Sequence, residues 1–291
     1  MSLSKTTVGN FELYTIETGD FKLDGGAMFG VVPKTLWSRG IEADENNRIQ
    51  MTMRCLLIKS KATDKLYLID NGLGTKFNEK LMKIYQVDFS KHTMERSFSE
   101  HGFNFEDVTD VIFTHLHFDH CGGTSYYDED GNQQYTFPNA EYHVNKSHWE
   151  TATSPNAREK ASFLPENINP LKETDNLNLV DDDHIYEEGL SAIIVNGHTL
   201  GQQLPLIEGD GKKICFVADL LPTHVHVPLP WVMGYDMYPA ETLKEKENFL
   251  ERAVKEDFYL YLEHDYYKEI ITLDSENNKY SVKDSFTLSE I

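Results

Sequence analysis

One segment carries four side chains that can bind a metal within six residues: Thr114-His115-Leu116-His117-Phe118-Asp119-His120-Cys121-Gly122-Gly123. It directly follows the apolar run 111–113, which is typical of a buried β-strand, so the four side chains are expected in a loop at a strand end. His115 and His117 can face the same way, while Asp119 and His120 continue the turn. Imidazole and carboxylate together suit divalent metals such as zinc, manganese, iron or cobalt. A polar loop with unrelated histidines is the alternative, and the density of ligand types argues against it.

Three more ligand-type side chains follow or end apolar runs further along the chain. His198 comes after the run 190–196, Asp219 ends the run 212–219, and His264 ends the run 258–264. Each alone would be an ordinary capping or hydrogen-bonded residue. Together with the histidine-rich segment they predict one metal centre assembled from several strand ends.

The rest of the chain alternates short β-like runs with helical segments, which favours a layered α/β fold. Apolar residues recur at helical spacing over 240–256, and segments 76–101 and 145–175 are interpreted as broken helices. Pro and Gly are scattered and composition does not shift, so residues 1–291 are predicted to form one domain. Strands are expected at 11–16, 52–59, 65–70, 107–115, 140–145, 190–196, 212–219 and 258–264.

Composition limits the class of partner. The chain has 48 acidic and 27 basic side chains, a formal net charge of −21, which disfavours both nucleic acid and an anionic membrane surface. No run of about 18 apolar residues or secretory signal is visible, so no membrane partner is expected. Three cysteines, Cys55, Cys121 and Cys215, cannot all pair within one chain. Free thiols in a reducing compartment follow, and the predicted location is cytoplasmic.

The order of these motifs resembles the metallo-β-lactamase superfamily over nearly the whole chain. The resemblance implies a four-layer αββα sandwich with a two-metal site at the sheet edge. It further implies that Asp70, in Leu68-Ile69-Asp70-Asn71-Gly72-Leu73-Gly74, steadies the histidine loop. Carried over by position, the ligands of one metal are His115, His117 and His198, those of the other are Asp119, His120 and His264, and Asp219 bridges.

Segments 25–37, 219–224 and 264–266 resemble the branch of YtnP-type quorum-quenching lactonases and methyl parathion hydrolase. The resemblance implies two divalent ions per chain, zinc first, with manganese, iron or cobalt as alternatives, and a homodimer. It also implies a hydrolase that opens lactones or related esters by attack of a metal-bridging hydroxide, with Asp119 and Asp219 as catalytic residues. Residues expected to wall the substrate pocket are Met28, Phe29, Trp37, Phe118, His224, His226, Trp231 and Tyr266.

One position departs from the acyl-homoserine lactonases. Pro222 stands where those enzymes carry a tyrosine, and His224 or His226 is the candidate replacement. A phosphotriesterase or arylesterase of the same fold is therefore the main alternative. A phosphodiesterase or nuclease is weakened by the acidic balance. A di-iron oxidoreductase would carry Glu at the place of His117, and a purely structural metal would need only four ligands.

Overall fold

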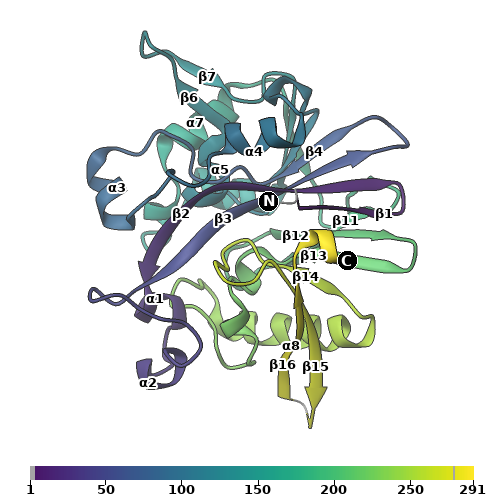
Figure 1. The fold of residues 1–291 in the computed structure, drawn as a ribbon. Coiled ribbons are helices and arrows are strands. Elements are labelled where there is room, and N and C mark those ends of the chain that lie inside the picture. Colours follow the sequence, from purple (N-terminus) through teal and green to yellow (C-terminus); the bar gives the residue numbers. More distant parts are fainter. Residues whose placement is uncertain (1–3, 278) are drawn as a thin grey trace.

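Two seven-stranded β-sheets pack face to face in the computed structural model, which describes residues 4–277 and 279–291 (Figure 1). The first sheet has the strand order β1 (Lys5–Val8), β2 (Phe11–Asp24), β3 (Arg48–Ser60), β4 (Leu66–Ile69), β5 (Asp110–Ile112), β8 (Glu141–Asn145) and β9 (Leu177–Val180). The second has the order β10 (Ile185–Glu187), β11 (Leu190–Val195), β12 (Gln202–Gly209), β13 (Lys212–Phe216), β14 (Tyr259–Tyr261), β15 (Ile270–Glu276) and β16 (Lys279–Phe286). A separate small hairpin pairs β6 (Ser125–Tyr127) with β7 (Gln133–Tyr135).

Helices cover the outer faces of both sheets. The α-helices are α1 (Gly25–Phe29), α2 (Lys34–Trp37), α3 (Glu79–Tyr85), α4 (Met94–His101), α5 (Phe118–Cys121), α6 (Lys146–Thr153), α7 (Pro165–Glu173) and α8 (Pro239–Lys255). Short 3-10 helices are η1 (Phe105–Asp107), η2 (Gly122–Thr124), η3 (Lys160–Ser162), η4 (Ala218–Leu220), η5 (His224–His226) and η6 (Leu288–Glu290). In Figure 1, α4, α5 and α7 lie beyond one sheet and α8 beyond the other. The predicted four-layer αββα sandwich is confirmed.

The main apolar cluster lies between the sheets and draws on both. Leu56 and Ile58 of β3 meet Leu204 of β12 and Leu260 of β14 in this cluster, all with exposed fractions near zero. Fully burying one such side chain contributes about 1.5–3 kcal/mol to stability. Packing between the sheets therefore contributes strongly to the stability of the fold.

Parallel pairing decides where the loops gather. β5 is parallel to β4 and β8, and β13 is parallel to β14. Carboxyl ends of parallel strands meet at one edge of a sheet, so the loops that follow them become neighbours. The histidine-rich segment follows β5, and the loops that carry Asp219 and His264 follow β13 and β14.

Helix α8 confirms the helix expected at 240–256. Pro239 occupies its first turn, where a missing N–H costs nothing, and Phe249, Leu250 and Ala253 are buried on one face. The segments interpreted as broken helices contain α3 and α4, and α6 and α7, respectively.

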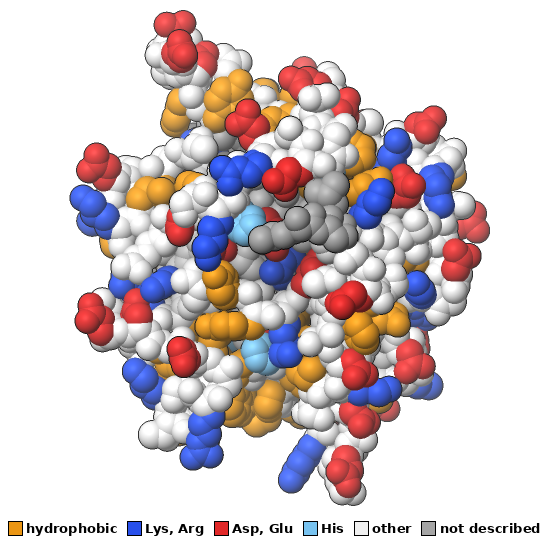
Figure 2. Space-filling model, in the orientation of Figure 1, with side chains coloured by type: hydrophobic (Ala, Val, Ile, Leu, Met, Phe, Trp, Pro, Cys, Tyr) orange, Lys and Arg blue, Asp and Glu red, His pale blue; other side chains and the backbone are white. Residues whose placement is uncertain are grey.

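The molecular surface carries interspersed charge. On the face shown in Figure 2, acidic and basic side chains alternate around the periphery. None of the described helices is long and apolar enough to cross a membrane. Cys55, Cys121 and Cys215 are all free and buried.

Candidate metal centre

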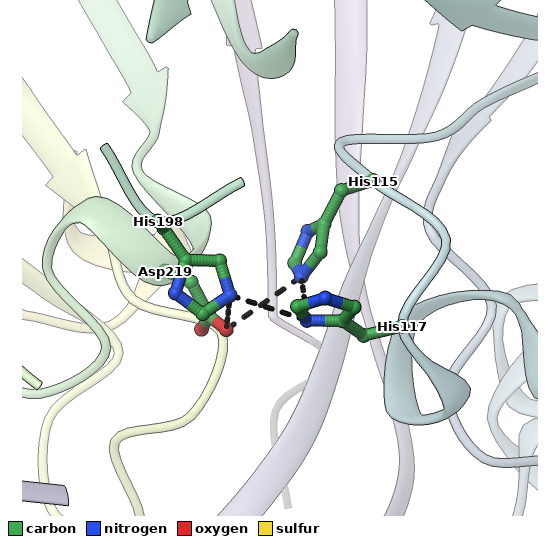
Figure 3. Close-up of side chains that lie close together, drawn as sticks. All are labelled: His115, His117, His198 and Asp219. Atoms are coloured by element: carbon green, nitrogen blue, oxygen red, sulfur yellow. Dashed lines mark hydrogen bonds and ion pairs between the residues drawn. The ribbon is translucent and has the colours of Figure 1, made fainter. Parts of the chain in front are cut away.

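All the predicted ligands lie just beyond the carboxyl ends of strands from both sheets. His115 and His117 follow β5, and Asp119 lies in α5 directly after them. His198 follows β11 of the other sheet. Asp219 lies in η4 after β13, His264 follows β14, and His120 lies in α5. Figure 3 shows His115 and His117 entering from one side and His198 and Asp219 from the other.

The first donor cluster consists of His115, His117, His198 and Asp219. His117 Nδ1 lies 3.0 Å from His115 Nε2 and 3.2 Å from His198 Nε2. Asp219 Oδ2 lies 3.1 Å from His198 Nε2 and 3.7 Å from His115 Nε2. Three ring nitrogens and one carboxylate oxygen thus point at one position (Figure 3).

The second cluster consists of Asp119, His120 and His264. The Nε2 atoms of the two histidines lie 3.2 Å apart, and each is 3.9 Å from an oxygen of Asp119. Asp219 borders this cluster as well, with Oδ1 3.2 Å from His264 Nε2 and Oδ2 3.6 Å from His120 Nε2. Asp219 therefore lies between the two clusters.

This donor set fits two divalent metals. Ligand nitrogens about 2.0–2.1 Å from a tetrahedral ion lie roughly 3.3 Å from one another, close to the nitrogen–nitrogen separations of 3.0–3.2 Å found here. Asp219 Oδ1 is buried and makes no well-aligned hydrogen bond to the described residues, although His264 Nε2 lies 3.2 Å from it. A buried carboxylate oxygen without a donor is costly unless a cation or proton compensates it. The clusters are therefore suited to dinuclear metal binding.

The loop that carries four of the ligands is held by Asp70. Its Oδ1 accepts from the Thr114 backbone N–H at 2.8 Å, and its Oδ2 accepts from the Thr114 hydroxyl at 2.6 Å. His120 Nδ1 lies 3.0 Å from the same Oδ2. Asp70 is fully buried. Its three contacts place it against the histidine loop, where the resemblance expects it. A hydrogen-bonded carboxylate of this kind fixes the ring orientation of a metal ligand.

Gly122 lets two backbone segments meet behind the histidine loop. A Cβ at this position would lie 1.9 Å from the Leu73 carbonyl oxygen. The Gly72–Gly74 turn packs directly on the end of α5 for this reason, with Gly123 N–H donating to the Gly72 carbonyl at 3.2 Å. The glycines quoted in the motif thus have a packing cause.

Carboxylates that the sequence did not single out orient two more ligands. His117 Nε2 lies 3.3 Å from Glu159 Oε1, which also accepts from the Thr199 hydroxyl. His198 Nδ1 lies 3.0 Å from Asp236 Oδ1. Neither acid follows an apolar run, so nothing in the sequence signalled either role. Both are buried.

His264 takes its second partner from the opposite sheet. Its Nδ1 lies 3.0 Å from the Thr52 carbonyl oxygen of β3. The backbone pairs as well, since Thr52 N–H donates to the His264 carbonyl at 3.2 Å. Strand β3 therefore positions this ligand although it carries none itself.

A further histidine, His148 of α6, links two ligand loops. Its Nε2 accepts from the Leu116 backbone N–H at 2.7 Å, and its Nδ1–H donates to the Leu200 carbonyl at 2.9 Å. Accepting at one nitrogen and donating at the other requires a neutral ring. Burial lowers the pKa of His148 to about 3, which keeps the ring in that form. The two hydrogen bonds of His148 join the loop of His115 and His117 to the loop of His198.

In the absence of metals, the acidic and basic side chains of the site stabilise each other's charged forms. Burial opposes the charged form of His198 and His264, but the Asp219 carboxylate outweighs it and raises their pKa values to about 10 and about 9. Burial opposes ionisation of Asp219 too, yet these two imidazolium rings hold its pKa well below the usual range. Burial lowers the pKa of His115 and His117. Because metals bind neutral imidazole, loading must displace protons and weakens at acid pH.

A cavity of about 290 Å³ opens onto both clusters. Most of its wall is apolar or aromatic, and Met28 and Phe118 are the two predicted pocket residues that line it. The other lining residues are Leu23, Met51, Tyr85, His117, Asp119, Arg158, Glu159, Ala161, Ser162, His198, Asp219, Met233, Gly234, Tyr235, Met237 and His264.

Three predicted pocket residues form an aromatic stack behind this wall. Phe29 lies parallel to Trp37 and to His226, with ring centroids 5.0 Å and 4.4 Å away. All three are buried, and His226 Nε2 lies 2.9 Å from the Met28 carbonyl oxygen. The glycine-containing segment 25–37 thus folds into two short helices that support Met28 from behind.

The three remaining predicted pocket residues lie outside the cavity. His224 Nδ1 lies 2.5 Å from Asp265 Oδ2, and with Trp231 it lines a separate surface pocket. Tyr266 is 37% exposed, and its hydroxyl accepts from Lys91 Nζ at 2.9 Å. Neither His224 nor His226 lines the cavity; His224 contacts Asp265 instead, and His226 contacts the Met28 carbonyl.

Comparisons with known proteins agree with this geometry. Residues 54–264 match the family model described as the metallo-beta-lactamase superfamily. A probable metal-dependent hydrolase from Staphylococcus aureus is 28% identical, with a TM-score of 0.86 over 97% of this chain and 98% of that one.

Two further solved structures share the fold at lower identity. AidC, a dizinc quorum-quenching lactonase solved with the product N-hexanoyl-L-homoserine, is 22% identical, with a TM-score of 0.79 over 98% of each chain. A variant of AiiA from B. thuringiensis with N-decanoyl-L-homoserine bound at the active site is 19% identical, with a TM-score of 0.66 over 91% of this chain and 95% of that one. With its two donor clusters and this fold, the chain belongs to the metallo-β-lactamase superfamily, as a metal-dependent hydrolase.

Proposed function

We propose that this protein is a dinuclear metal hydrolase that opens lactones or related esters. The observation that carries the proposal is the position of Asp219 between two donor clusters at the floor of one cavity. We assign His115, His117 and His198 to one metal and Asp119, His120 and His264 to the other, with Asp219 shared. Two divalent ions there would lower the pKa of a bound water and polarise the substrate oxygen.

The remaining chemistry falls to side chains of the cavity. Asp119 belongs to the second cluster and also lines the cavity, so its carboxylate can take the proton of the attacking water and pass it to the leaving alkoxide. Met28, Phe118 and Met233 supply apolar wall that excludes bulk water and suits an acyl or aryl group.

Two tyrosines are candidates for the role that the acyl-homoserine lactonases give to a tyrosine at the position of Pro222. Tyr85 and Tyr235 both line the cavity, and burial raises the pKa of each above its usual value. They therefore stay protonated at neutral pH and can donate a hydrogen bond to a substrate carbonyl. This assignment takes the place of the His224 or His226 assignment made from sequence.

Lactones rank first among the substrates because structural neighbours include lactonases with opened acyl-homoserine lactones bound. Zinc ranks first among the metals for a similar reason, since AidC is a dizinc enzyme. Quorum quenching would follow only if acyl-homoserine lactones prove to be the substrate.

The test is a turnover panel on metal-loaded protein: an N-acyl-homoserine lactone, a simple γ-lactone, a 4-nitrophenyl ester and a phosphotriester. Asp119→Asn keeps the shape of the side chain but loses the basic oxygen, so kcat should fall at least about 100-fold. Asp130→Asn, on an exposed turn between β6 and β7, is the matched control. Turnover of esters or phosphotriesters alone would move the substrate class, and no turnover of any compound would contradict the proposal.

A further inference from the structure

Arg158 brings a positive charge to the wall of the active-site cavity. It is the only Arg or Lys among the described residues that line this cavity. It forms no ion pair with any described carboxylate, although the chain carries 48 acidic side chains. A guanidinium that lines a cavity without an acidic partner can bind an anion from solution.

The guanidinium is held in place by backbone carbonyls. Arg158 Nη2 donates to the Gly234 carbonyl at 2.5 Å and to the Asp236 carbonyl at 3.2 Å. These are the hydrogen bonds that the side chain makes to the described part of the chain, so its Nε and Nη1 hydrogens are uncommitted there. Carbonyl oxygens fix the planar group without neutralising its charge.

Two residues attached to Arg158, Asp236 by a hydrogen bond and Glu159 through the chain, place the guanidinium relative to the metal centre. Asp236, whose carbonyl accepts from Arg158, holds His198 through its carboxylate at 3.0 Å. Glu159, next in the chain, lies 3.3 Å from His117. Arg158 is therefore anchored by residues that orient two ligands of the first cluster, which gives a fixed span between the metals and the arginine.

The charges that line the cavity are compatible with an anion at Arg158. Two divalent ions would bring four positive charges against three lining carboxylates, Asp119, Glu159 and Asp219, while the buried Asp70, Asp236 and Glu263 lie behind the ligands. Arg158 is an exposed residue, and its guanidinium is the positive group of the described lining outside the donor clusters. An anion is therefore favoured at the guanidinium itself.

Resting on the proposed function, we propose that Arg158 binds a carboxylate at the far end of the substrate, so that the preferred substrate is an ester or lactone bearing a free carboxylate. The scissile group would lie at the metals and the second acid at the guanidinium, with the apolar wall between them. A planar carboxylate matches the paired N–H groups of arginine.

Binding is the first readout and does not require turnover. Glutarate and pentanoate have the same chain length, but only glutarate carries a second carboxylate. Calorimetric titration of the metal-loaded protein with each should show at least about tenfold tighter binding of glutarate, the scale of one charge-assisted hydrogen bond. In Arg158→Met this ratio should fall to near one, and Arg158→Lys should give an intermediate ratio.

Turnover is the second readout. Mono-4-nitrophenyl glutarate and 4-nitrophenyl pentanoate share a leaving group and differ in the distal carboxylate. The ratio of their kcat/KM values should favour the glutarate ester in the wild type and fall at least about tenfold in Arg158→Met, mostly through KM. Lys160→Met, on the same loop but outside the cavity lining, should keep the wild-type ratio.

A purely structural role for Arg158 gives a different result. If the arginine only joins the two loops through its carbonyl bonds, Arg158→Met will weaken both ligands and both esters alike and leave each ratio in place. That result, or a wild-type protein that does not prefer glutarate, overturns the proposal. If neither ester is hydrolysed but glutarate binding depends on Arg158, the hydrolase proposal fails while the anion site stands.

Discussion

Each candidate ligand histidine directs one ring nitrogen into a donor cluster and bonds to the protein through the other. His115 lies 3.0 Å from the Thr114 hydroxyl, His117 has Glu159, and His198 has Asp236. A hydrogen bond at the far nitrogen fixes the tautomer and the ring orientation, so the near nitrogen presents its lone pair. Precision in the metal centre therefore depends on residues that do not touch the metals.

Replacing Glu159 tests this dependence. Glu159→Gln keeps the volume but removes the charge that orients His117, so affinity for the metal of the first cluster should fall about 10–100-fold. Competition with a chromogenic chelator measures that affinity. Glu150→Gln, on the exposed side of α6, should bind metal as the wild type does, and an unchanged affinity in Glu159→Gln would contradict the assigned role.

His226 should make stability depend on pH. Burial lowers its pKa to about 3, against about 6.5 in an unfolded chain. Between these values the unfolded state binds one more proton than the folded state, so stability falls as pH is lowered through this window. From pH 6.5 to 5.0 this one group should remove about 1.5–2 kcal/mol of unfolding free energy.

Urea unfolding of His226→Gln at both pH values isolates the effect from that of metal loss. Gln keeps a donor for the Met28 carbonyl but does not titrate. Between pH 6.5 and 5.0 the variant should therefore lose about 1.5–2 kcal/mol less unfolding free energy than the wild type. His92→Gln, at an exposed position, should lose as much as the wild type. Parallel losses in all three proteins would mean that His226 is not the titrating group.

At the scale of single residues, the sequence predicted those functional side chains that lie close in the chain to an apolar strand. The seven ligand candidates were identified because each follows an apolar strand, and the structure brings all seven together. Glu159, Asp236 and Arg158 lie in irregular segments, where spacing carries no signal. Trp37 was expected in the pocket from the resemblance of segment 25–37, yet it is buried in a stack against Phe29.

At the scale of elements, β3 joins the two sheets at the metal centre through Arg54. Its guanidinium forms an ion pair with Glu17 at 2.8 Å and donates to the Leu262 and Asp265 carbonyls at 2.7 Å and 3.1 Å. Those carbonyls flank His264. A buried arginine with several acceptors thus holds the loop of one sheet against a strand of the other.

Removing that arginine should cost much of the stability. Arg54→Met removes the cation paired with the partly buried Glu17 carboxylate, which keeps the Thr52 hydroxyl as a donor, and it removes a donor from two carbonyls. We expect this change to lower the unfolding free energy by about 3–5 kcal/mol. Arg39→Met, at an exposed position, should change it by less than about 0.5 kcal/mol. Chemical denaturation of both variants measures the difference, and equal small effects would refute the role of β3.

Element prediction succeeded where apolar periodicity was clear and failed where it was masked. Helix α8 and the strands of the metal-bearing loops were predicted. β12 was missed because Gln202, Gln203 and Pro205 interrupt the apolar pattern, although all three are buried in the sheet. The hairpin β15–β16 was missed because its distal half is charged and exposed. Pairing with neighbours outweighs local propensity in both.

On the scale of the whole molecule, the metal centre lies across the junction of the two sheets. His115, His117, Asp119 and His120 come from the first sheet, and His198, Asp219 and His264 from the second. Two bound ions would cross-link the halves of the sandwich. We propose, on the same ground and on the shared apolar cluster, that the chain is one domain; the homodimer implied by the resemblance stays a proposal for measurement of mass in solution.

Metal removal should therefore weaken the whole fold. Ions held at about 1,000 times their Kd stabilise the folded state by about 4 kcal/mol, so chelation should lower Tm by about 5–15 °C. Differential scanning calorimetry before and after dialysis against EDTA measures the change, and added zinc should reverse it. A Tm that chelation leaves in place would mean that metals do not bridge the sheets.

We expect seven side chains to hold two metals in each chain. Elemental analysis of protein reconstituted with zinc and freed of excess metal tests it most directly, with Asp219→Ala measured beside the wild type. The wild-type chain should hold two metals, and Asp219→Ala should lose at least one of them, because the Asp219 carboxylate lies between both clusters. One metal or fewer in the wild type, or full loading of Asp219→Ala, would contradict it.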